Sequence, residues 1–351
     1  QLLPTIFVSD LNNHFLNWFK LDDRIINIKY PEKIANIISK DELLNLESKI
    51  QKNKLSQFVS LVRDEPLLDK KLPGSKIIFT KKYPSINTRE FRLENGVRVF
   101  LKPTKNKEKS FYFEASSMGG YSHANLTELP SAKITDDLIS ESSLGDFSRV
   151  ELNNKVPSSF AGVEVEIGPY QEGLKGKAIT KYTKELFELI YLNFTSVRFD
   201  DVGLENIKSY LREKIRNENL DPGKVFFKKI RHVLYKNHPR RQPWNLNLID
   251  KIKLDKINNF YMDRFADSSD FVFTFVGDFS IDEMKPYIEK YLGSLPSIKR
   301  KENYIDHNIR TENKSKNIEV KENSEEKSVN YRLYNHKFKN NIKNRTKLYI
   351  L

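Results

Sequence analysis

Apolar side chains recur at helical spacing in three long stretches of the chain. Thr183 precedes the first stretch, Asp200 or Asp201 the second, and the pair Asp221-Pro222 the third. Because apolar positions three or four residues apart share one face of a helix, each stretch predicts an amphipathic helix that begins at these residues. The apolar positions are Leu186, Phe187, Ile190, Tyr191 and Phe194; Leu204, Ile207, Leu211 and Ile215; and Val225, Phe226, Ile230 and Val233.

Alternating apolar and polar residues predict strands between these helices. Residues 89–104, REFRLENGVRVFLKPT, hold two such runs around Asn95-Gly96. This pair favours a two-residue hairpin turn in which both positions take a positive φ. Residues 110–117 and 158–170 predict two further strands. Because strands and helices do not alternate strictly, the pattern predicts an α+β fold, an antiparallel sheet with helices packed on one face.

Two distant segments share a pattern of a helix followed by a strand. Residues 11–13, Leu-Asn-Asn, match residues 257–259, Ile-Asn-Asn, and Phe19 matches Phe265. Each segment then passes through a turn that contains Asp into an apolar strand, which is residues 24–30 in the first copy. The match predicts an internal repeat of homologous domains, with residues 3–30 superposing on residues 257–276. A chance match of so short a pattern is the alternative.

The repeat predicts four parts along the chain. Residues 1–31 would be the tail of a preceding homologous domain, and residues 32–85 a helical interdomain linker. Residues 86–297 would form one complete domain. Residues 298–351 would be a linker and the first strand of a truncated following domain. Strong helix formers over residues 33–62 and a polar composition after Pro296 favour this division.

The two ends of the chain carry further expectations. Val329, Tyr331 and Leu333 alternate with polar residues, so they predict one face of a strand. An unpaired strand edge attracts another strand, and we expect this one to be paired. The chain begins at Gln1 rather than Met, so we expect it to be a segment of a longer protein.

Composition excludes several classes of protein. The chain of 351 residues contains no cysteine, which excludes disulfides, thiolate zinc sites and cysteine nucleophiles. No apolar run approaches the roughly 20 residues of a membrane span. The net charge of +13 is compatible with nucleic-acid binding, but the basic residues are interspersed with 47 acidic ones and form no stripe. We therefore predict a solvated basic surface and no nucleic-acid partner. The compartment is open, with the periplasm or cell envelope favoured over the cytoplasm.

Five segments in order carry a family resemblance. They are NGVRVFLKPT, SSMGGYSHANLTELPSAKITDDLISESSLGDFS, LIYLNFTSVRFDD, YKNHPRRQP and FADSSDFVFTFVGDFSIDEMKPYIEKYLGSLP. Together they resemble the insulinase/pitrilysin family of zinc metallopeptidases, the inverzincins, over roughly residues 3–296. The resemblance implies pitrilysin-like domains. Long bacterial members carry four similar α+β domains, arranged as two halves around a chamber that admits unfolded peptides; the first domain binds zinc and the third is its degenerate copy.

The resemblance also places the degenerate zinc motif. In the catalytic domain a helix carries H-x-x-E-H, because histidines at i and i+4 share a face and the glutamate acts on zinc-bound water. At these positions Lys133 and Asp137 replace the two ligands and Asp136 replaces the general base. Glu213 keeps a carboxylate where the family has its third ligand. Carboxylates beside a lysine do not make a zinc site, so we predict a solvated or salt-bridged helix surface, no metal and no catalytic residue.

The remaining candidate residues lie in and beside the loop HPRRQP. His232 and His238 are the nearest pair among six histidines, but the end of a helix and Pro239 separate them, which excludes a metal pair. Two prolines flank Arg240 and Arg241 and predict a conformationally fixed loop. One interpretation is that both arginines face the chamber and bind substrate carboxylates. The alternative is a purely structural loop.

The resemblance implies a function that this chain shares with a partner. The chain would be the non-catalytic C-terminal half of a zinc metallopeptidase, forming one wall of the chamber and binding peptides. Its partner would be the N-terminal catalytic half, which would hold the zinc of the full-length protein, and the chain alone would be inactive. The alternative is a peptide-binding or scaffolding protein of the same fold with no active half. An H-x-x-E-H motif upstream of Gln1 would distinguish the two.

Overall fold

The computed structural model of the chain describes most of its residues, in two units. The described residues are 5–18, 25–29, 38–53, 63–106, 108–311, 319, 332, 338–339 and 341–350. The first unit covers residues 1–60 and the second residues 61–351. In the first unit lie helices α1 (Val8–Trp18) and α2 (Lys40–Lys52). A capping box between Ser39 and Glu42 begins α2, in which each side chain accepts a hydrogen bond from the other residue's main chain.

The predicted repeat is confirmed for its helix and wrong for one strand. Helix α1 corresponds to α10 (Leu254–Arg264), and strand β9 (Val272–Gly277) follows α10. Residues 25–29 are not a strand, and Ile25 is 97% exposed. A strand persists only where its main chain bonds to a neighbour, and none pairs with residues 25–29 in the described part of the chain. The repeat therefore gives no support for a tandem array.

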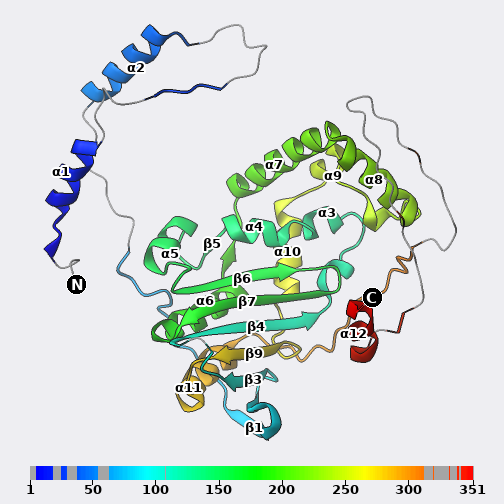
Figure 1. The fold of residues 1–351 in the computed structure, drawn as a ribbon. Coiled ribbons are helices and arrows are strands. Elements are labelled where there is room, and N and C mark those ends of the chain that lie inside the picture. The colour runs from blue at the N-terminus through cyan, green and yellow to red at the C-terminus, as the bar shows by residue number, and fades with distance from the viewer. Residues whose placement is uncertain are drawn as a thin grey trace. The chain divides into compact units, whose positions relative to one another are not determined.

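A seven-stranded sheet forms the centre of the second unit (Figure 1). Its order is β1-β2-β3-β9-β4-β7-β6. The strands other than β9 are β1 (Ile77–Tyr83), β2 (Thr88–Leu93), β3 (Arg98–Pro103), β4 (Ser110–Met118), β6 (Ala161–Ile167) and β7 (Gln171–Ile179). Neighbours are antiparallel except β3 and β9, which pair in parallel with Phe100 opposite Thr274. The predicted α+β fold is confirmed, with one parallel pair. Strands β5 (Ser143–Leu144) and β8 (Val197–Arg198) form a separate two-stranded sheet.

The three helices predicted from periodicity form as α6 (Thr183–Thr195), α7 (Asp201–Asn219) and α8 (Pro222–Leu234). The Asp200 carboxylate accepts the Gly203 N–H at 2.7 Å and begins α7, and Asp221 accepts the Lys224 N–H at 3.1 Å and begins α8. The other helices are α3 (Leu129–Ala132), α4 (Thr135–Glu141), α5 (Arg149–Lys155), α9 (Leu246–Asp250), α11 (Ile281–Tyr291) and α12 (Ile342–Ile350). None of the helices in the described ranges has the length and apolar character of a membrane span.

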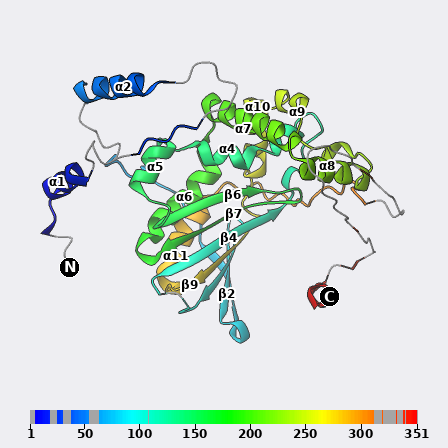
Figure 2. The same ribbon diagram turned by 45° about the horizontal axis from the view of Figure 1, so that its top comes forward.

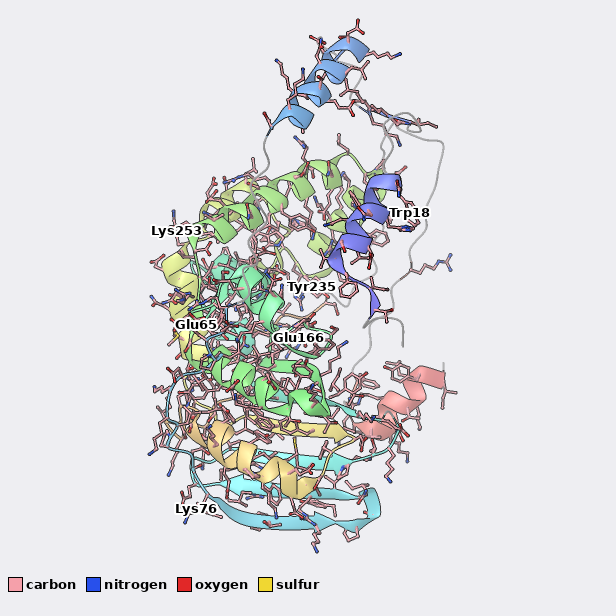
Figure 3. The ribbon with its side chains drawn as sticks, turned by 90° about the vertical axis from the view of Figure 1, so that its left-hand side faces the viewer. Trp18, Glu65, Lys76, Glu166, Tyr235 and Lys253 are labelled. Carbon is pink, nitrogen blue, oxygen red and sulfur yellow. The ribbon has the colours of Figure 1, made fainter. Side chains whose placement is uncertain are left out.

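Helices α6 and α11 cover one face of the sheet, and α4, α7 and α8 lie beyond β6 (Figures 1 and 2). Phe275 of β9 lies under α6, and its ring centroid is 5.3 Å from that of Phe187. Side chains fill the space between these helices and the strands (Figure 3). Alternate residues of central strands such as β4 and β9 reach this core, whereas β1 has no buried residue. In the central strands the period-2 pattern that predicted them also builds their buried face.

Two glycines redirect the chain after β4. Gly119 and Gly120 have φ angles of 152° and 58°, and a Cβ on Gly120 would lie 2.2 Å from the Gly168 carbonyl oxygen. The buried Glu172 carboxylate accepts the Gly120 N–H. Burial raises the pKa of Glu172 to about 7, although this N–H and Arg264 oppose the rise. The turn directs the following chain towards the helices beyond β6. In the predicted hairpin between β2 and β3, Gly96 has a positive φ and Asn95 does not.

In the structure, the domain extends beyond both of the boundaries predicted from the sequence. The sheet begins with β1, and Leu72 is buried in the core, so the domain takes in part of the predicted linker 32–85. After Pro296 the chain runs back over the domain, where Arg264 Nη1 lies 2.8 Å from a Glu302 carboxylate oxygen. A polar composition does not reveal such ion pairs, which form only in the folded chain. The predicted strand at Val329, Tyr331 and Leu333 lies outside the described residues.

Replacing Phe275 by Ala tests the core. The substitution leaves a cavity beside Phe113 and Phe187, and we expect the free energy of unfolding to fall by about 3–5 kcal/mol. Thr274→Ala, on the opposite face of the same strand, is the control and should cost less than about 1 kcal/mol. Urea unfolding of both variants measures the difference, and equal losses would contradict this assignment of the two faces.

Candidate functional site

The helix that would carry the zinc motif is broken in two. Helix α3 ends at Ala132 and α4 begins at Thr135, with Lys133 and Ile134 between them. Ile134 has φ −112° and ψ 5°, outside the helical range. Positions 133 and 137 therefore do not lie one turn apart on one helix. Ile134 and Leu138 are buried in an apolar cluster that packs α4 against α7 and α9, which holds the break in place.

The degenerate motif positions each have a separate environment. Lys133 Nζ donates a hydrogen bond to the Arg240 carbonyl oxygen at 3.0 Å. An Asp136 carboxylate oxygen accepts the main-chain N–H of Ile167, at the end of β6, at 3.3 Å. Glu213 is exposed and lies 3.0 Å from Arg216, one turn along the same helix. The described residues contain no cluster of three or more His, Cys, Asp or Glu that could hold a metal ion.

Burial shifts the pKa values of the ionisable groups in this region in the direction that favours their uncharged forms. Burial raises the pKa of Asp136, and repulsion from Asp137 adds to the rise, while the Ile167 N–H opposes it. Burial likewise raises the pKa of Asp137 against the opposing charge of Lys214. Burial lowers the pKa of Lys133 to about 8, with further contributions from Arg241 and Arg240. Desolvation is the largest cause of all three shifts, and like charges add to it at Lys133 and Asp136.

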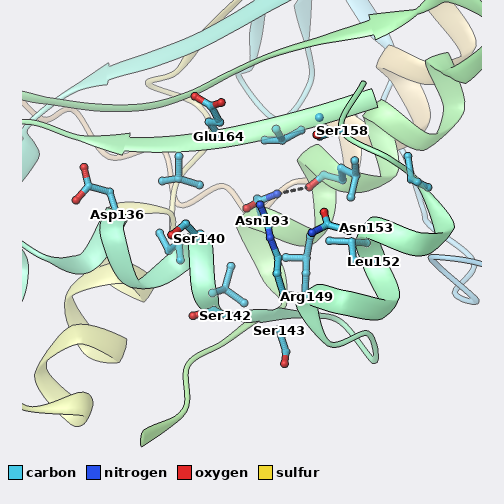
Figure 4. Close-up of a pocket in the computed structure, with 18 of the residues that line it drawn as sticks. Asp136, Ser140, Ser142, Ser143, Arg149, Leu152, Asn153, Ser158, Glu164 and Asn193 are labelled. Atoms are coloured by element: carbon cyan, nitrogen blue, oxygen red, sulfur yellow. Dashed lines mark hydrogen bonds between the residues drawn. The ribbon is translucent and has the colours of Figure 1, made fainter. Parts of the chain in front are cut away.

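A cavity of about 320 Å³ runs along the outer edge of β6 (Figure 4). Residues 161–166 of the strand form one wall, and residues of α4, β5 and α5 form the other. Figure 4 shows Glu164 on the strand side and Arg149 on the opposite side of the cavity. Strand β6 is an edge of the sheet, with β7 as its neighbour. The cavity therefore lies where another strand would pair.

The main chain of β6 offers hydrogen bonds to this cavity. The N–H groups of Ala161 and Ile167 point away from β7, because they donate to the Pro157 carbonyl and to Asp136. Strand residues alternate in direction, so the N–H groups of Val163 and Val165, between them, point the same way. Both residues line the cavity. An extended peptide could add to the sheet here as a further strand.

The two arginines of the loop HPRRQP differ in their roles. Arg240 is 6% exposed, and its guanidinium donates to the carbonyl oxygens of Ala124, at 2.7 Å, and of Tyr121 and Ser122. These bonds make Arg240 a structural residue, in line with the structural alternative for this loop. Arg241 is exposed, and its guanidinium lies 5.2 Å from the Tyr235 ring centroid. Of the pair, Arg241 is the one with a side chain placed to meet a ligand.

Sequence reasoning missed the β6 edge as a candidate site. Residues 158–170 predicted a strand, but the pattern does not tell an edge strand from a central one. The site is built largely from main-chain groups, which leave no signature of residue type. The two glutamates Glu164 and Glu166, on the exposed side of the strand, were the available hint, because charged side chains are common on edge strands.

Comparison with known proteins shows what parts of the chain are similar to. Residues 251–344 match the family described as the peptidase M16 inactive domain. A curated protein of Haemophilus influenzae, named "Probable zinc protease PqqL", is 22% identical over 212 residues, which are 59% of this chain and 22% of that protein. The match to the family runs beyond residue 297, the predicted end of the domain. The chain covers well under two thirds of the relative's length.

Two solved structures have the same fold. The crystal structure of the periplasmic protease PqqL from Escherichia coli has a TM-score of 0.63 at 20% identity, over 87% of this chain and 34% of that one. The ferredoxin protease FusC, in complex with Arabidopsis ferredoxin, has a TM-score of 0.57 at 18% identity, over 88% of this chain and 34% of that one. Together with the family match, they confirm the resemblance to the insulinase/pitrilysin peptidases.

Replacing Lys133 by Met tests the electrostatics of the broken helix. The pKa of Lys133 in the folded chain is about 8, below the ordinary value of 10.5. The unfolded state therefore binds more protons between these pH values, and this residue makes stability rise with pH across that interval. We expect the wild type to gain about 1–2 kcal/mol relative to Lys133→Met between about pH 7 and about pH 10. Urea unfolding of both proteins measures this, and a difference that does not change with pH would refute the shift.

Proposed function

Because the chain carries the inactive domain of the M16 family of zinc peptidases, we propose that it is the non-catalytic part of such an enzyme and forms one wall of its peptide chamber. In this proposal a separate catalytic half holds the zinc and cleaves the substrate. The periplasm is the proposed compartment, because the relative of known structure is described as a periplasmic protease.

The edge of β6 is the observation that carries the proposal. The strand presents main-chain donors to a cavity of about 320 Å³, while the positions of the zinc motif face separate partners. A site built from main-chain groups binds extended peptides with little dependence on their sequence, because every peptide has the same main chain. Peptides and unfolded protein are therefore the proposed substrates. The ferredoxin protease of the same fold was crystallised with a protein, ferredoxin.

The second candidate function is a peptide-binding or scaffolding protein with no active half. It uses the same edge of β6 and requires no zinc in the full-length protein. The two proposals differ in whether the upstream sequence contains H-x-x-E-H. They also differ in whether a complex of this chain with its upstream half cleaves peptides.

Replacing Val163 by Pro tests binding at the edge strand. Proline removes the outward N–H but leaves the hydrogen bonds between β6 and β7, because the N–H of Val163 points away from β7. We expect a labelled, unstructured peptide to bind the chain about three- to tenfold more weakly, the value of one hydrogen bond. Fluorescence anisotropy measures the affinity.

The matched control is Val163→Ala, which keeps the N–H and removes the side chain. It should bind the peptide within about twofold of the wild type, because the lost contact is small. Circular dichroism checks that both variants fold. Equal weakening in the two variants would show that the peptide contacts the side chain rather than the main chain of β6, and would contradict strand addition.

A cleavage assay tests the division of labour. We expect this chain alone to show no chelator-sensitive peptide cleavage, because a catalytic zinc needs about three protein ligands and one open position. Adding an upstream half that carries H-x-x-E-H should produce cleavage that a chelator abolishes. Chelator-sensitive cleavage by the chain alone, lost on Asp136→Ala or Glu213→Ala, would overturn the proposal. Binding without cleavage by the complex would favour the scaffolding alternative.

A further inference from the structure

A second cavity, of about 370 Å³, lies beside the first residue of the degenerate motif. Its walls come from the turn after β4, from α7 and α8, from the loop 240–244 and from the segment after Pro296. Its lining in the described part of the chain is strongly basic, with Glu218 as its one acid. The basic residues are Lys133, Lys214, Lys228, Arg231, Arg240 and Arg241.

Several of these basic groups have no carboxylate partner. Lys228 is paired with Glu218 at 3.2 Å, and Arg240 bonds to carbonyl oxygens. Lys133 bonds to a single carbonyl oxygen, and Arg241 lies over the ring of Tyr235. Arg231 and Lys214 form no ion pair with any described residue. The cavity therefore concentrates positive charge that the described residues compensate only in part, since Glu218 pairs with Lys228 and the charge of Lys214 acts on Asp137.

Burial, together with repulsion from other basic groups of the cavity, lowers the pKa of Lys133. These basic groups are Arg241 and Arg240, and the pKa of the ammonium group falls to about 8. An anion in the cavity would offset this repulsion and favour the charged, ammonium form of Lys133. Aromatic side chains, Tyr170, Tyr235 and Trp244, share the walls with the basic groups. Such a mixture suits an organic anion better than a bare inorganic one, since rings contact its apolar part.

The edge strand leads directly to this cavity. Residues 161–166 of β6 line the first cavity, and Pro169 and Tyr170, in the turn that follows β6, line the second. A peptide laid along β6 would thus continue from one cavity towards the other. The volume of the second cavity is that of a small ligand site, which suits one or two residues of a peptide.

We propose that the basic cavity around Lys133 and Arg241 binds a carboxylate of the peptide that pairs with β6, from an acidic side chain or the peptide C-terminus. This inference rests on the proposed function and adds a preference to it. The position that would hold a zinc ligand in a catalytic domain here holds an ammonium group, so a metal site is replaced by a site for anions. Arg241 supplies a planar donor pair that matches a carboxylate, and Lys133 supplies a point charge.

Peptides that differ only in carboxylates test the proposal. One unstructured, labelled peptide is neutral with an amidated C-terminus; a second has a free C-terminal carboxylate; a third has an internal Asp and an amidated C-terminus. We expect at least one of the two acidic peptides to bind the wild-type chain about tenfold more tightly than the neutral one, the value of a charge-assisted hydrogen bond. Which one gains identifies the source of the carboxylate.

Variants of the cavity residues test whether the higher affinity for acidic peptides comes from the basic cavity. In Lys133→Met and in Arg241→Gln the preference for the acidic peptide should fall to about twofold or less, with the affinity for the neutral peptide unchanged. Lys229→Met is the matched control, because Lys229 is an exposed residue of α8 that does not line the cavity. It should keep the full preference. Melting curves check that each variant is folded.

The possible failures are distinguishable. Equal affinity for acidic and neutral peptides in the wild type, or a preference that survives both cavity variants, would overturn the carboxylate site and leave the edge-strand proposal standing. No binding of any peptide would overturn both. Displacement of the acidic peptide by a single-stranded DNA oligonucleotide at lower concentration than by unlabelled acidic peptide would assign the cavity to nucleic acid and overturn the proposal.

Discussion

The pairing of β9 with both β3 and β4 is the interaction on which the rest of the domain depends. Strand β9 is the last strand of the described residues but lies inside the sheet, bonded to β3 in parallel and to β4 in antiparallel order. Everything between β4 and β9 except β6 and β7 must therefore leave the sheet and return. That excursion contains the broken helix and most of the walls of both cavities. The positions of both cavities therefore depend on β9 being in place in the sheet.

Burial shifts the pKa values of the charged groups within the excursion. Asp136 and Lys133 lie on either side of the start of α4. Burial raises the pKa of Asp136 and lowers that of Lys133, so in both residues it favours the uncharged form. Asp136 occupies the end of the β6 edge by accepting the Ile167 N–H, so a peptide that pairs with β6 and continues towards the second cavity would leave the strand before Ile167. Lys133 faces the basic cavity. The short segment from Lys133 to Asp136 thus contributes to both cavities, Asp136 to the one along β6 and Lys133 to the basic one.

The edge of β6 and the basic cavity would recognise different properties of a peptide. Pairing with β6 depends on the extended main chain, which all peptides share, whereas the basic cavity responds to charge. A substrate that uses both gains affinity from a single acidic group without a requirement for sequence elsewhere. Under the proposed function, such a division would suit a chamber that handles varied peptides.

The sequence by itself determined the fold class, the helices α6 to α8, the caps of α7 and α8, most strands of the sheet and the resemblance to the insulinase/pitrilysin peptidases. These features depend on local periodicity and on residues whose chemistry shows in the letters, such as Asp200 and Asp221. Only the tertiary structure decided that residues 25–29 form no strand, that β1 belongs to the sheet and that Arg240 is structural while Arg241 is exposed. Each of these depends on contacts that the local pattern does not show, from the neighbouring strand β2 for β1 to the distant carbonyl of Ala124 for Arg240. The edge of β6 and the basic cavity belong to the same group, because main-chain donors and uncompensated charge exist as sites only where folding leaves them without neighbours.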